Sequence, residues 1–335
     1  MIESFIQVVS TLLPFILLIG LGGGLKWVTL RNARAWANKA GDLSSRAKAA
    51  PDWKMLDWLC YWVLNPALLF TAASARPVTL DKVLENSVWV WLLMISALLL
   101  ILPWKKLVSI NAVEFASRAQ TAWRFNSVVG LAATSIISPD AMQAMAIFIG
   151  ATVPLANFLA VAGLSLASGE RDRSALNRTA KSILLNPFLL ASGAGLLVGL
   201  TVGGDTAFMS YPLVAVLYST ANLVAQAAIP MSLIAVGTAV LWKDLFRVNP
   251  LSIYVLSLQL IILPGLALGL SLAFGIAEAT AIALIVFGAL PTSTSSHILG
   301  AAYGARRGPT ALIVSQSTVL ACLGLPFWIM IAQII

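Results

Sequence analysis

Stretches of about twenty apolar residues recur along the whole chain and are separated by shorter polar segments. Because a helix needs about 20 consecutive apolar residues to cross the hydrocarbon core of a bilayer, each stretch is typical of a membrane-spanning helix. The pattern therefore predicts an all-α integral membrane protein with ten spans. These spans are residues 5–28, 56–73, 87–103, 121–138, 141–167, 183–201, 213–241, 251–274, 279–302 and 310–334.

The ninth stretch is interrupted by polar residues that a lipid-facing helix does not carry. Pro291 is followed by five hydroxyl residues and then by the chain's only histidine, in the order Thr292, Ser293, Thr294, Ser295, Ser296 and His297. Proline removes a backbone donor, and in lipid the freed groups must be satisfied by protein or by water in a cavity. We therefore expect Pro291 and the hydroxyls to line a substrate-binding site. In the alternative interpretation, the hydroxyls bond their own or neighbouring helices.

The fourth stretch contains a second polar interruption, formed by Arg124, Asn126 and Ser127 and followed by Gly130. Half-helices that begin at such breaks present unpaired N–H groups, which favour anions. We predict that Asn126 and Ser127 contact a substrate. Arg124 is either a counter-charge for a substrate carboxylate or a side chain that reaches to the membrane interface.

Polar and helix-breaking residues follow a similar order in the two halves of the chain. Ten spans divide into two sets of five, and because five is odd the second set must be inverted, as is common in secondary transporters. We predict one integrated membrane domain, with a first five-helix repeat over residues 1–175 and an inverted repeat over residues 176–335. We expect helix breaks at Pro66, Gly130, Pro230 and Pro291, and further cavity or coupling positions at Asn65, Asn222 and Gln226.

Composition and charge indicate the environment and the orientation of the chain. Hydrophobic residues make up 59% and charged residues 10% of the 335 residues, whereas soluble domains carry about 25% charged residues. Of the 21 Lys and Arg residues, 18 fall in the odd-numbered loops between predicted spans and two in the even-numbered loops. Cytoplasmic loops carry such an excess. We expect a multi-pass protein of the plasma (bacterial inner) membrane, with both termini on the non-cytoplasmic side and a basic cytoplasmic loop over residues 29–55.

Five short motifs occur in a recognisable order along nearly the full chain. They are residues 64–70, 124–127 with Gly130 and Leu131, 186–188, 229–233 with Gly237, and 290–292 with Ile298, Leu299, Tyr303 and Gly304. The motifs resemble those of the auxin efflux carrier family, in the bile acid/auxin carrier superfamily, which includes plant PIN carriers and bacterial malonate-transporter-like proteins. The resemblance implies that discontinuous fourth and ninth helices cross at the membrane centre. Ala132 and Ala133 stand where many members have a proline, so unwinding of the fourth helix would rest on Gly130.

These features predict a secondary active transporter that moves a small organic anion, a mono- or dicarboxylate or an auxin-like acid, by alternating access. The alternatives are a sodium-coupled bile-acid-type symporter and a non-transporting ligand sensor or channel with the same fold. A proton or sodium is the candidate coupling ion. His297 is either a proton carrier, since its unperturbed pKa lies near neutrality, or a buried neutral histidine bonded to a backbone carbonyl. The lipid bilayer is a partner, and a homodimer is a candidate assembly.

Other function classes are disfavoured by what the chain lacks. No Asp or Glu falls in the middle of a predicted span, where cation–proton antiporters need such carboxylates. No phosphate-binding Gly-Lys-Ser/Thr loop is present, and no Asp accompanies His297 to make a catalytic triad. Cys60 and Cys322 lie in apolar stretches and make neither a disulfide framework nor a metal site. The basic loops account for the net charge of +8 without nucleic acid. We expect no enzymatic activity, cofactor or metal.

Overall fold

The computed structural model describes residues 2–40, 53–169, 181, 184–201 and 211–334. Every element within these ranges is helical, apart from one isolated β-bridge, and this confirms the all-α class. Residues 41–52, the middle of the predicted basic loop, lie outside the described residues. The predicted boundary between the two repeats, at residues 175 and 176, lies outside them as well.

The helices of the first half of the chain are α1 Ile2–Ala40, α3 Lys54–Leu59, α4 Asn65–Ser74, α5 Leu80–Ile101, α6 Ala112–Ala119, α7 Ser127–Ser135 and α8 Pro139–Ser168. Those of the second half are α10 Pro187–Thr201, α12 Pro212–Ala239, α13 Pro250–Ser257, α14 Leu263–Phe274, α15 Glu278–Gly288, α16 Ser296–Ala302 and α17 Arg307–Ala332. Single π-helical turns, Cys60–Leu64 and Leu258–Ile262, join α3 to α4 and α13 to α14.

Seven helical segments among the described residues are long and apolar enough to cross a membrane. They match the first, second, third, fifth, seventh, eighth and tenth predicted spans. The sixth, α10, has 15 residues and falls short of the roughly 20 that a span needs. The ninth forms two short helices, α15 and α16. The fourth contains α7 and the non-helical residues directly before it, because α6 ends at Ala119, ahead of the predicted start at residue 121. The interruptions expected in these two stretches are therefore present, whereas the count of ten spans stays a prediction.

Polar capping residues, rather than hydropathy, set where several helices begin. Helix α5, which corresponds to the third predicted span, starts at Leu80 and not at the predicted residue 87, because the Thr79 hydroxyl accepts a hydrogen bond from the Lys82 N–H. Ser138 caps α8 in the same way, through the N–H of Ala141. Side-chain oxygens at the N-cap satisfy donors that have no partner within the helix.

Three of the four expected helix breaks do not occur. Pro66 lies inside α4 and Pro230 lies inside α12, and both helices continue through their prolines. Just before Pro66, the Asn65 N–H bonds the carbonyl of Cys60, so a widened turn accommodates the proline. Gly130 is also helical, within α7. The fourth stretch instead breaks directly before Ser127, where the backbone is extended and a side chain caps the new helix.

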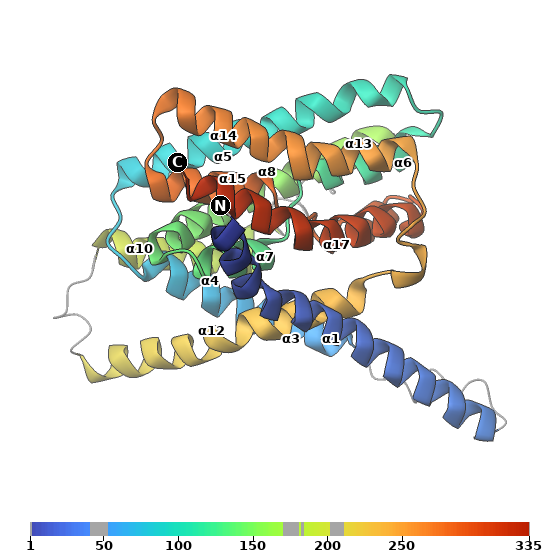
Figure 1. The fold of residues 1–335 in the computed structure, drawn as a ribbon, viewed down its shortest axis with the longest axis horizontal. Coiled ribbons are helices and arrows are strands. Elements are labelled where there is room, and N and C mark those ends of the chain that lie inside the picture. Colours follow the sequence, from blue (N-terminus) through green and yellow to red (C-terminus); the bar gives the residue numbers. More distant parts are fainter. Residues whose placement is uncertain (1, 41–52, 170–180, 182–183, 202–210, 335) are drawn as a thin grey trace.

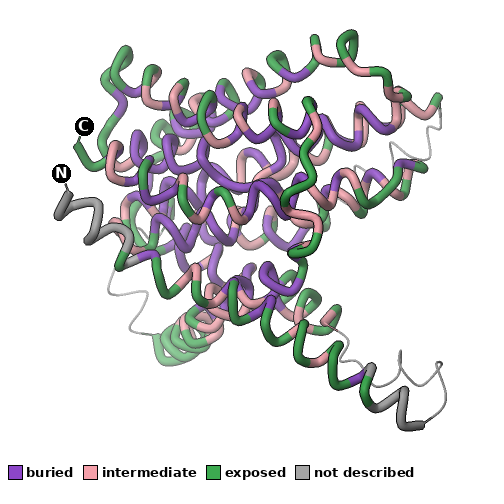
Figure 2. The backbone as a smooth tube through the Cα atoms, turned by 45° about the vertical axis from the view of Figure 1, so that its right-hand side comes forward, coloured by how far each residue is buried: buried purple, intermediate pink, exposed green. Residues whose placement is uncertain are grey.

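The helices form two bundles (Figure 1). The first, which we name the flanking bundle, contains α1, α3, α4, α10 and α12, with α12 packed against both α1 and α4. The second, the central bundle, contains α5 to α8 and α13 to α17, with α15 packed against α8, α14 and α17. Figure 2 shows the buried segments gathered in the middle of the molecule, whereas α1 and α12 are exposed along much of their length.

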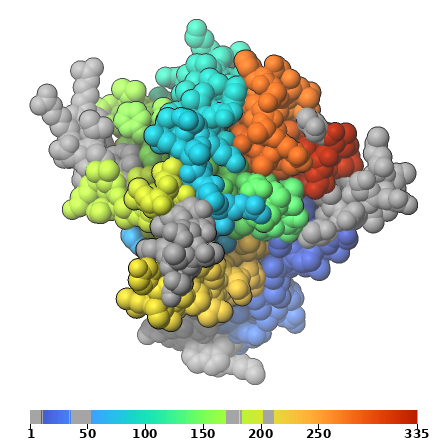
Figure 3. All heavy atoms as spheres, turned by 90° about the vertical axis from the view of Figure 1, so that its left-hand side faces the viewer, coloured from blue at the N-terminus to red at the C-terminus, as the bar shows by residue number. Residues whose placement is uncertain are grey.

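The connections gather at two opposite ends of the molecule. At the right of Figure 1 lie the C-terminal end of α1 and the segments between α5 and α6, α12 and α13, and α16 and α17. We name this the basic end, because these are the segments rich in Lys and Arg. Figure 3 shows the opposite end, where the beginning of α5 (cyan) lies between the turn from α14 to α15 (orange) and the start of α12 (yellow).

Candidate functional site

The two interrupted stretches cross each other, and their extended segments pair. Phe125 and Thr292 form an antiparallel β-bridge. The Asn126 N–H donates to the Pro291 carbonyl at 2.8 Å, and the Ser293 N–H donates to the Arg124 carbonyl at 3.2 Å. Backbone groups that leave a helix inside a membrane need partners within the protein. Each break therefore satisfies the freed groups of the other.

Asn126 sets the beginning of the half-helix that leaves the crossing. Its backbone is extended, and its Oδ1 accepts hydrogen bonds from the N–H groups of Val128 at 3.2 Å and Val129 at 3.4 Å. Asparagine is among the most favourable N-cap residues because a short side-chain oxygen reaches these donors. Asn126, which was predicted to contact substrate, is therefore also the cap of α7.

Arg124 carries a buried positive charge at the crossing. The residue is only 9% exposed. Its guanidinium donates to Gln120 Oε1 at 3.1 Å, to Asn157 Oδ1 at 3.1 Å and to Ser295 Oγ at 3.0 Å. All three acceptors are neutral, and none of the ion pairs found among the described residues includes Arg124. Of the two interpretations from sequence, this burial disagrees with a side chain that reaches to the membrane interface.

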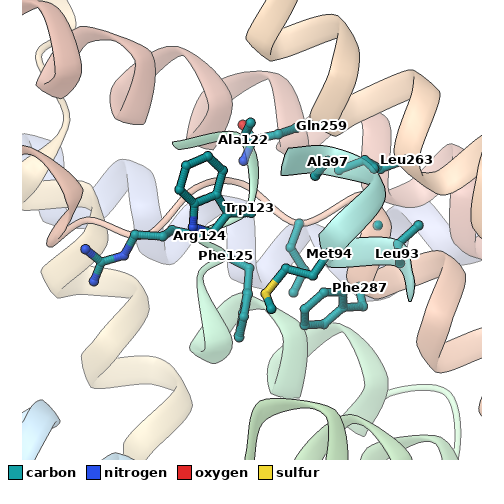
Figure 4. Close-up of a pocket in the computed structure, with 12 residues that line it drawn as sticks. Leu93, Met94, Ala97, Ala122, Trp123, Arg124, Phe125, Gln259, Leu263 and Phe287 are labelled. Carbon is teal, nitrogen blue, oxygen red and sulfur yellow. The ribbon is translucent and has the colours of Figure 1, made fainter. Parts of the chain in front are cut away.

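The crossing has an apolar side, from which Arg124 turns away. Met94, Leu263 and Phe287 surround a gap of only about 20 Å³ there, and the rings of Phe125 and Phe287 lie 4.5 Å apart. Figure 4 shows the Arg124 side chain pointing away from this cluster. The packing fixes the crossing on one side and directs the guanidinium to the other.

A cavity of about 780 Å³ lies on that other side, between the two bundles. Ligand pockets in proteins commonly have volumes of about 300–1,000 Å³. The central bundle contributes Arg124, Asn157 and the residues of both interruptions, while the flanking bundle contributes aromatic and amide side chains. The flanking residues include Trp58, Tyr61, Trp62, Asn65, Asn186 and Phe188.

The flanking wall of the cavity is fixed by polar contacts between helices. Ser232 of α12 donates to Asn65 Oδ1 of α4 at 2.9 Å, and both residues are buried. The Asn186 amide lies 3.5 Å from the Tyr61 hydroxyl, and the Asn186 Oδ1 accepts from the Phe188 N–H at 2.9 Å. The wall therefore presents amide and phenol groups beside aromatic and aliphatic side chains.

The structure brings most of the predicted site residues to this cavity. The lining includes Asn65, Arg124, Asn126, Ser127, Ser293, Thr294, Ser295 and His297. His297 is half-buried. The cavity also reaches Lys26, Asp57 and Leu241, which lie towards the basic end.

Five of the predicted positions do not line the cavity. Thr292 and Ser296 are fully buried, and within the described part of the chain their hydroxyls have no partner. Ser296 contributes its carbonyl, which accepts from the Gln120 side chain at 3.1 Å. Pro291 is buried, and its carbonyl accepts the hydrogen bond from the Asn126 N–H. Asn222 and Gln226 lie on α12 outside the cavity lining, more than one turn before Ser232.

Several residues of the site were not predictable from the sequence. Tyr61 and Asn157 line the cavity but were not predicted, and neither was Gln120, which accepts a hydrogen bond from Arg124 one turn later in the chain. The amide of Asn157 in the middle of an apolar stretch was the strongest available signal, because a polar side chain at membrane depth needs a polar partner. Tyr61 gave no such signal, since aromatic residues are frequent at membrane interfaces.

Known proteins similar to this chain are membrane transporters. The sequence profile of a family described as "Membrane transport protein" matches residues 179–329. A protein of Rhizobium meliloti (strain 1021) with the name "Putative malonate transporter" is 28% identical over 177 residues. That alignment covers 51% of this chain and 53% of the relative, so the chain matches about half the length of that protein.

Proposed function

Since this chain belongs to the membrane transport protein family, that of the auxin efflux carriers, we propose that it is a secondary carrier of a small organic anion. The observation that carries the proposal is the buried guanidinium of Arg124 beside a ligand-sized cavity. A charge within a membrane protein is costly unless it is paired, and such residues commonly mark substrate pathways. A substrate carboxylate would supply the negative charge that the neighbouring side chains lack.

The donors around Arg124 suit an oxyanion such as a carboxylate. A guanidinium has five N–H donors, and hydrogen bonds to three neutral oxygens leave the remaining donors and the whole charge for a ligand. A carboxylate would accept two parallel hydrogen bonds from such a group by displacing the Asn157 or Ser295 oxygen from Nη2. Ser293, Thr294 and Ser295 add hydroxyl donors beside it in the same cavity. Asn126 acts mainly by capping α7 and so by fixing the crossing.

The proposed architecture has ten spans in two inverted halves. α5, the α6–α7 pair and α8 follow one another in the first half as α13–α14, the α15–α16 pair and α17 do in the second. The two broken pairs meet through reciprocal hydrogen bonds, with one donor from each half. Such reciprocity is the arrangement that a two-fold axis in the membrane plane would give. The repeats would occupy residues 1–175 and 176–335.

The proposed mechanism is alternating access, in which the central bundle moves against the flanking bundle. The large cavity extends from the crossing towards the basic end. Towards the opposite end of the molecule, the space between α1, α7 and α17 is a gap of only about 40 Å³. That smaller gap is lined almost wholly by apolar residues such as Leu12, Val129 and Leu325. If the basic end is cytoplasmic, as the charge distribution favours, the described state is open to the cytoplasm and closed to the outside.

Two features bear on coupling. His297 lines the cavity and is the one side chain of the chain whose unperturbed pKa lies near neutrality, so a proton is the coupling ion that we favour. A sodium ion would need several oxygen ligands, which the described part of the cavity lining offers as hydroxyl and amide oxygens and, at Asp57, as one carboxylate. Because of His297, we place proton coupling ahead of sodium coupling.

Purified protein in proteoliposomes tests the proposal. Labelled malonate and monocarboxylates of increasing size would be offered under a pH gradient and, separately, under a sodium gradient. A carrier shows saturable uptake that accumulates substrate against its concentration. Uptake that never saturates indicates a channel, and binding without uptake indicates a ligand sensor. Either of these results would overturn the proposed function.

A further inference from the structure

The chain passes between the two bundles at two described linkers. Residues 75–79 join α4 to α5, and residues 240–249 join α12 to α13. A third passage, from α8 to α10, runs largely through residues outside the described ranges. Any movement of one bundle against the other must be taken up in these connections.

A buried glutamine of the central bundle holds each described linker. Gln143 of α8 donates through Nε2 to the carbonyls of Ala73 at 3.3 Å and Arg76 at 2.7 Å. Gln316 of α17 donates through Nε2 to the carbonyls of Leu245 at 2.8 Å and Arg247 at 2.7 Å. The two glutamines are 2% and 4% exposed. Each carboxamide thus bonds two carbonyls that lie close together in the sequence of the same linker region.

The two contacts have the same construction in the two halves of the chain. Gln143 follows its two acceptors by 70 and 67 residues, and Gln316 follows its acceptors by 71 and 69 residues. Both glutamines lie on the last helix of their half. The acceptors of Gln143 lie in the last turn of α4 and just after it, and those of Gln316 lie after α12. One arrangement has therefore been kept at both ends of the molecule.

A neighbouring polar contact reinforces each glutamine. One residue before Gln316, the Ser315 hydroxyl accepts a hydrogen bond from the Leu241 N–H at 2.9 Å. One turn before Gln143, Asp140 pairs with Arg76 at 3.2 Å. Carbonyls at the end of a helix have no donor within that helix, so a fixed side-chain donor determines the path of the chain that follows.

We propose that Gln143 and Gln316 are positioning residues for transport, which anchor the two linkers to the central bundle. The proposal rests on the alternating-access mechanism proposed above. Because each linker is held to the central bundle, the connection between the bundles can bend only where the linker meets α4 or α12. The central bundle would then move as one body about these two bending points. Loss of an anchor loosens the junction, so the state with the cavity open to the basic end is held less well.

Gln143→Met and Gln316→Met remove the donors at nearly constant side-chain volume. Gln259→Met is the matched control, because Gln259 is equally buried and donates to the carbonyl of Thr121, a contact within the central bundle. A general effect of losing a buried amide appears in all three variants. An effect that comes from loosening the linkers appears only in Gln143→Met and Gln316→Met.

The experiment has two readouts. The first is malonate uptake, for which we expect the maximum rate to fall at least about fivefold in Gln143→Met and Gln316→Met, with the half-saturating concentration within about twofold of wild type. The second is labelling of a Ser293→Cys reporter by a membrane-impermeant thiol reagent applied at the basic end. Cys60→Ser and Cys322→Ser remove the native thiols, of which Cys60 also lines the cavity. We expect labelling to slow at least about twofold in the two linker variants.

Unchanged labelling in both linker variants, or equal slowing in Gln259→Met, would overturn the role of the anchors. Because labelling needs no transported substrate, it reports on the anchors even if no organic anion is taken up. Failure of the wild-type protein to take up any organic anion would instead count against the proposed function.

Discussion

Asn126 and Pro291 lie far apart in the sequence, yet the N–H of Asn126 donates to the carbonyl of Pro291 at 2.8 Å. The bond joins the break in the fourth apolar stretch to the break in the ninth. It places Arg124, one residue before Phe125, beside the Ser295 hydroxyl, to which its guanidinium donates. The candidate anion site therefore depends on both halves of the chain at once.

Replacing the Arg124 charge tests its role as a counter-charge. We expect Arg124→Gln to weaken malonate binding at least about tenfold, since a hydrogen bond to a charged group contributes about 1.5–3 kcal/mol. Arg124→Lys should fall between this variant and wild type, because lysine keeps the charge but lacks the planar fork. Isothermal titration calorimetry on the purified protein measures both. Because Arg124→Gln also removes a buried charge, the melting temperature should not fall with the affinity. An affinity equal to that of wild type would contradict the assignment.

The capping role of Asn126 predicts different results for two substitutions. Asn126→Ala removes the cap of α7, at a cost of about 1 kcal/mol, and should lower both the melting temperature and uptake. Asn126→Ser keeps a side-chain oxygen that can accept from the same N–H groups, so stability and most of the uptake should be retained. If both variants lose uptake to the same extent while both remain stable, Asn126 acts through its amide on the substrate instead.

The two neighbouring serines of the ninth stretch should differ in their effect on binding. Ser295→Ala removes one of the partners that orient Arg124, and we expect affinity to fall about fivefold, as loss of a hydrogen bond worth about 1 kcal/mol would give. Ser296→Ala removes a fully buried hydroxyl that has no partner among the described residues, so affinity should stay unchanged. Titration of both variants checks this order. If affinity falls more in Ser296→Ala than in Ser295→Ala, the substrate binds on the side of the crossing that Ser296 faces, and the assignment of the cavity as the site is wrong.

A close helix contact within the flanking bundle predicts a large loss of stability. A Cβ built on Gly237 of α12 would clash with the backbone oxygen of Ile19 in α1, so Gly237→Ala must push the helices apart. We expect a destabilisation of about 1–3 kcal/mol or more. Gly24→Ala is the control on α1, since a Cβ there meets nothing within 4 Å. Thermal unfolding in detergent measures both, and equal melting temperatures would show that α1 and α12 are packed less closely.

The interruptions were predictable from the sequence, but the boundaries of the breaks were not. Proline and a run of hydroxyls inside an apolar stretch indicated the break at Pro291, because lipid cannot satisfy the freed backbone groups. The break before Ser127 was expected at Gly130, since hydropathy and glycine content do not register a side-chain cap. Asn126 decided it by capping α7. Breaks were also expected at Pro66 and Pro230, where none occurs, because a helix can continue through a proline when the preceding turn widens or its neighbours adapt.

The composition of the site was predictable only in part. Charged and amide residues at membrane depth, such as Arg124 and Asn126, stand out against their apolar surroundings. Which hydroxyls face the cavity does not follow from sequence, because Ser293 to Ser295 lie outside regular helix and follow no fixed period. Thr292 and Ser296 flank them and are fully buried. The neutral partners of Arg124 come from three separate segments, and only the folded crossing brings them together.

Counterflow is the most direct test of the central claim, that the protein transports an organic anion by alternating access and that Arg124 binds this anion. Proteoliposomes loaded with unlabelled malonate would be diluted into a trace of labelled malonate, without any ion gradient. We predict that wild-type protein accumulates the label transiently above its external concentration, whereas Arg124→Gln, folded to the same melting temperature, does not. Equal accumulation by the two proteins, or no accumulation by wild type with any of the carboxylates that bind to it, would contradict the account.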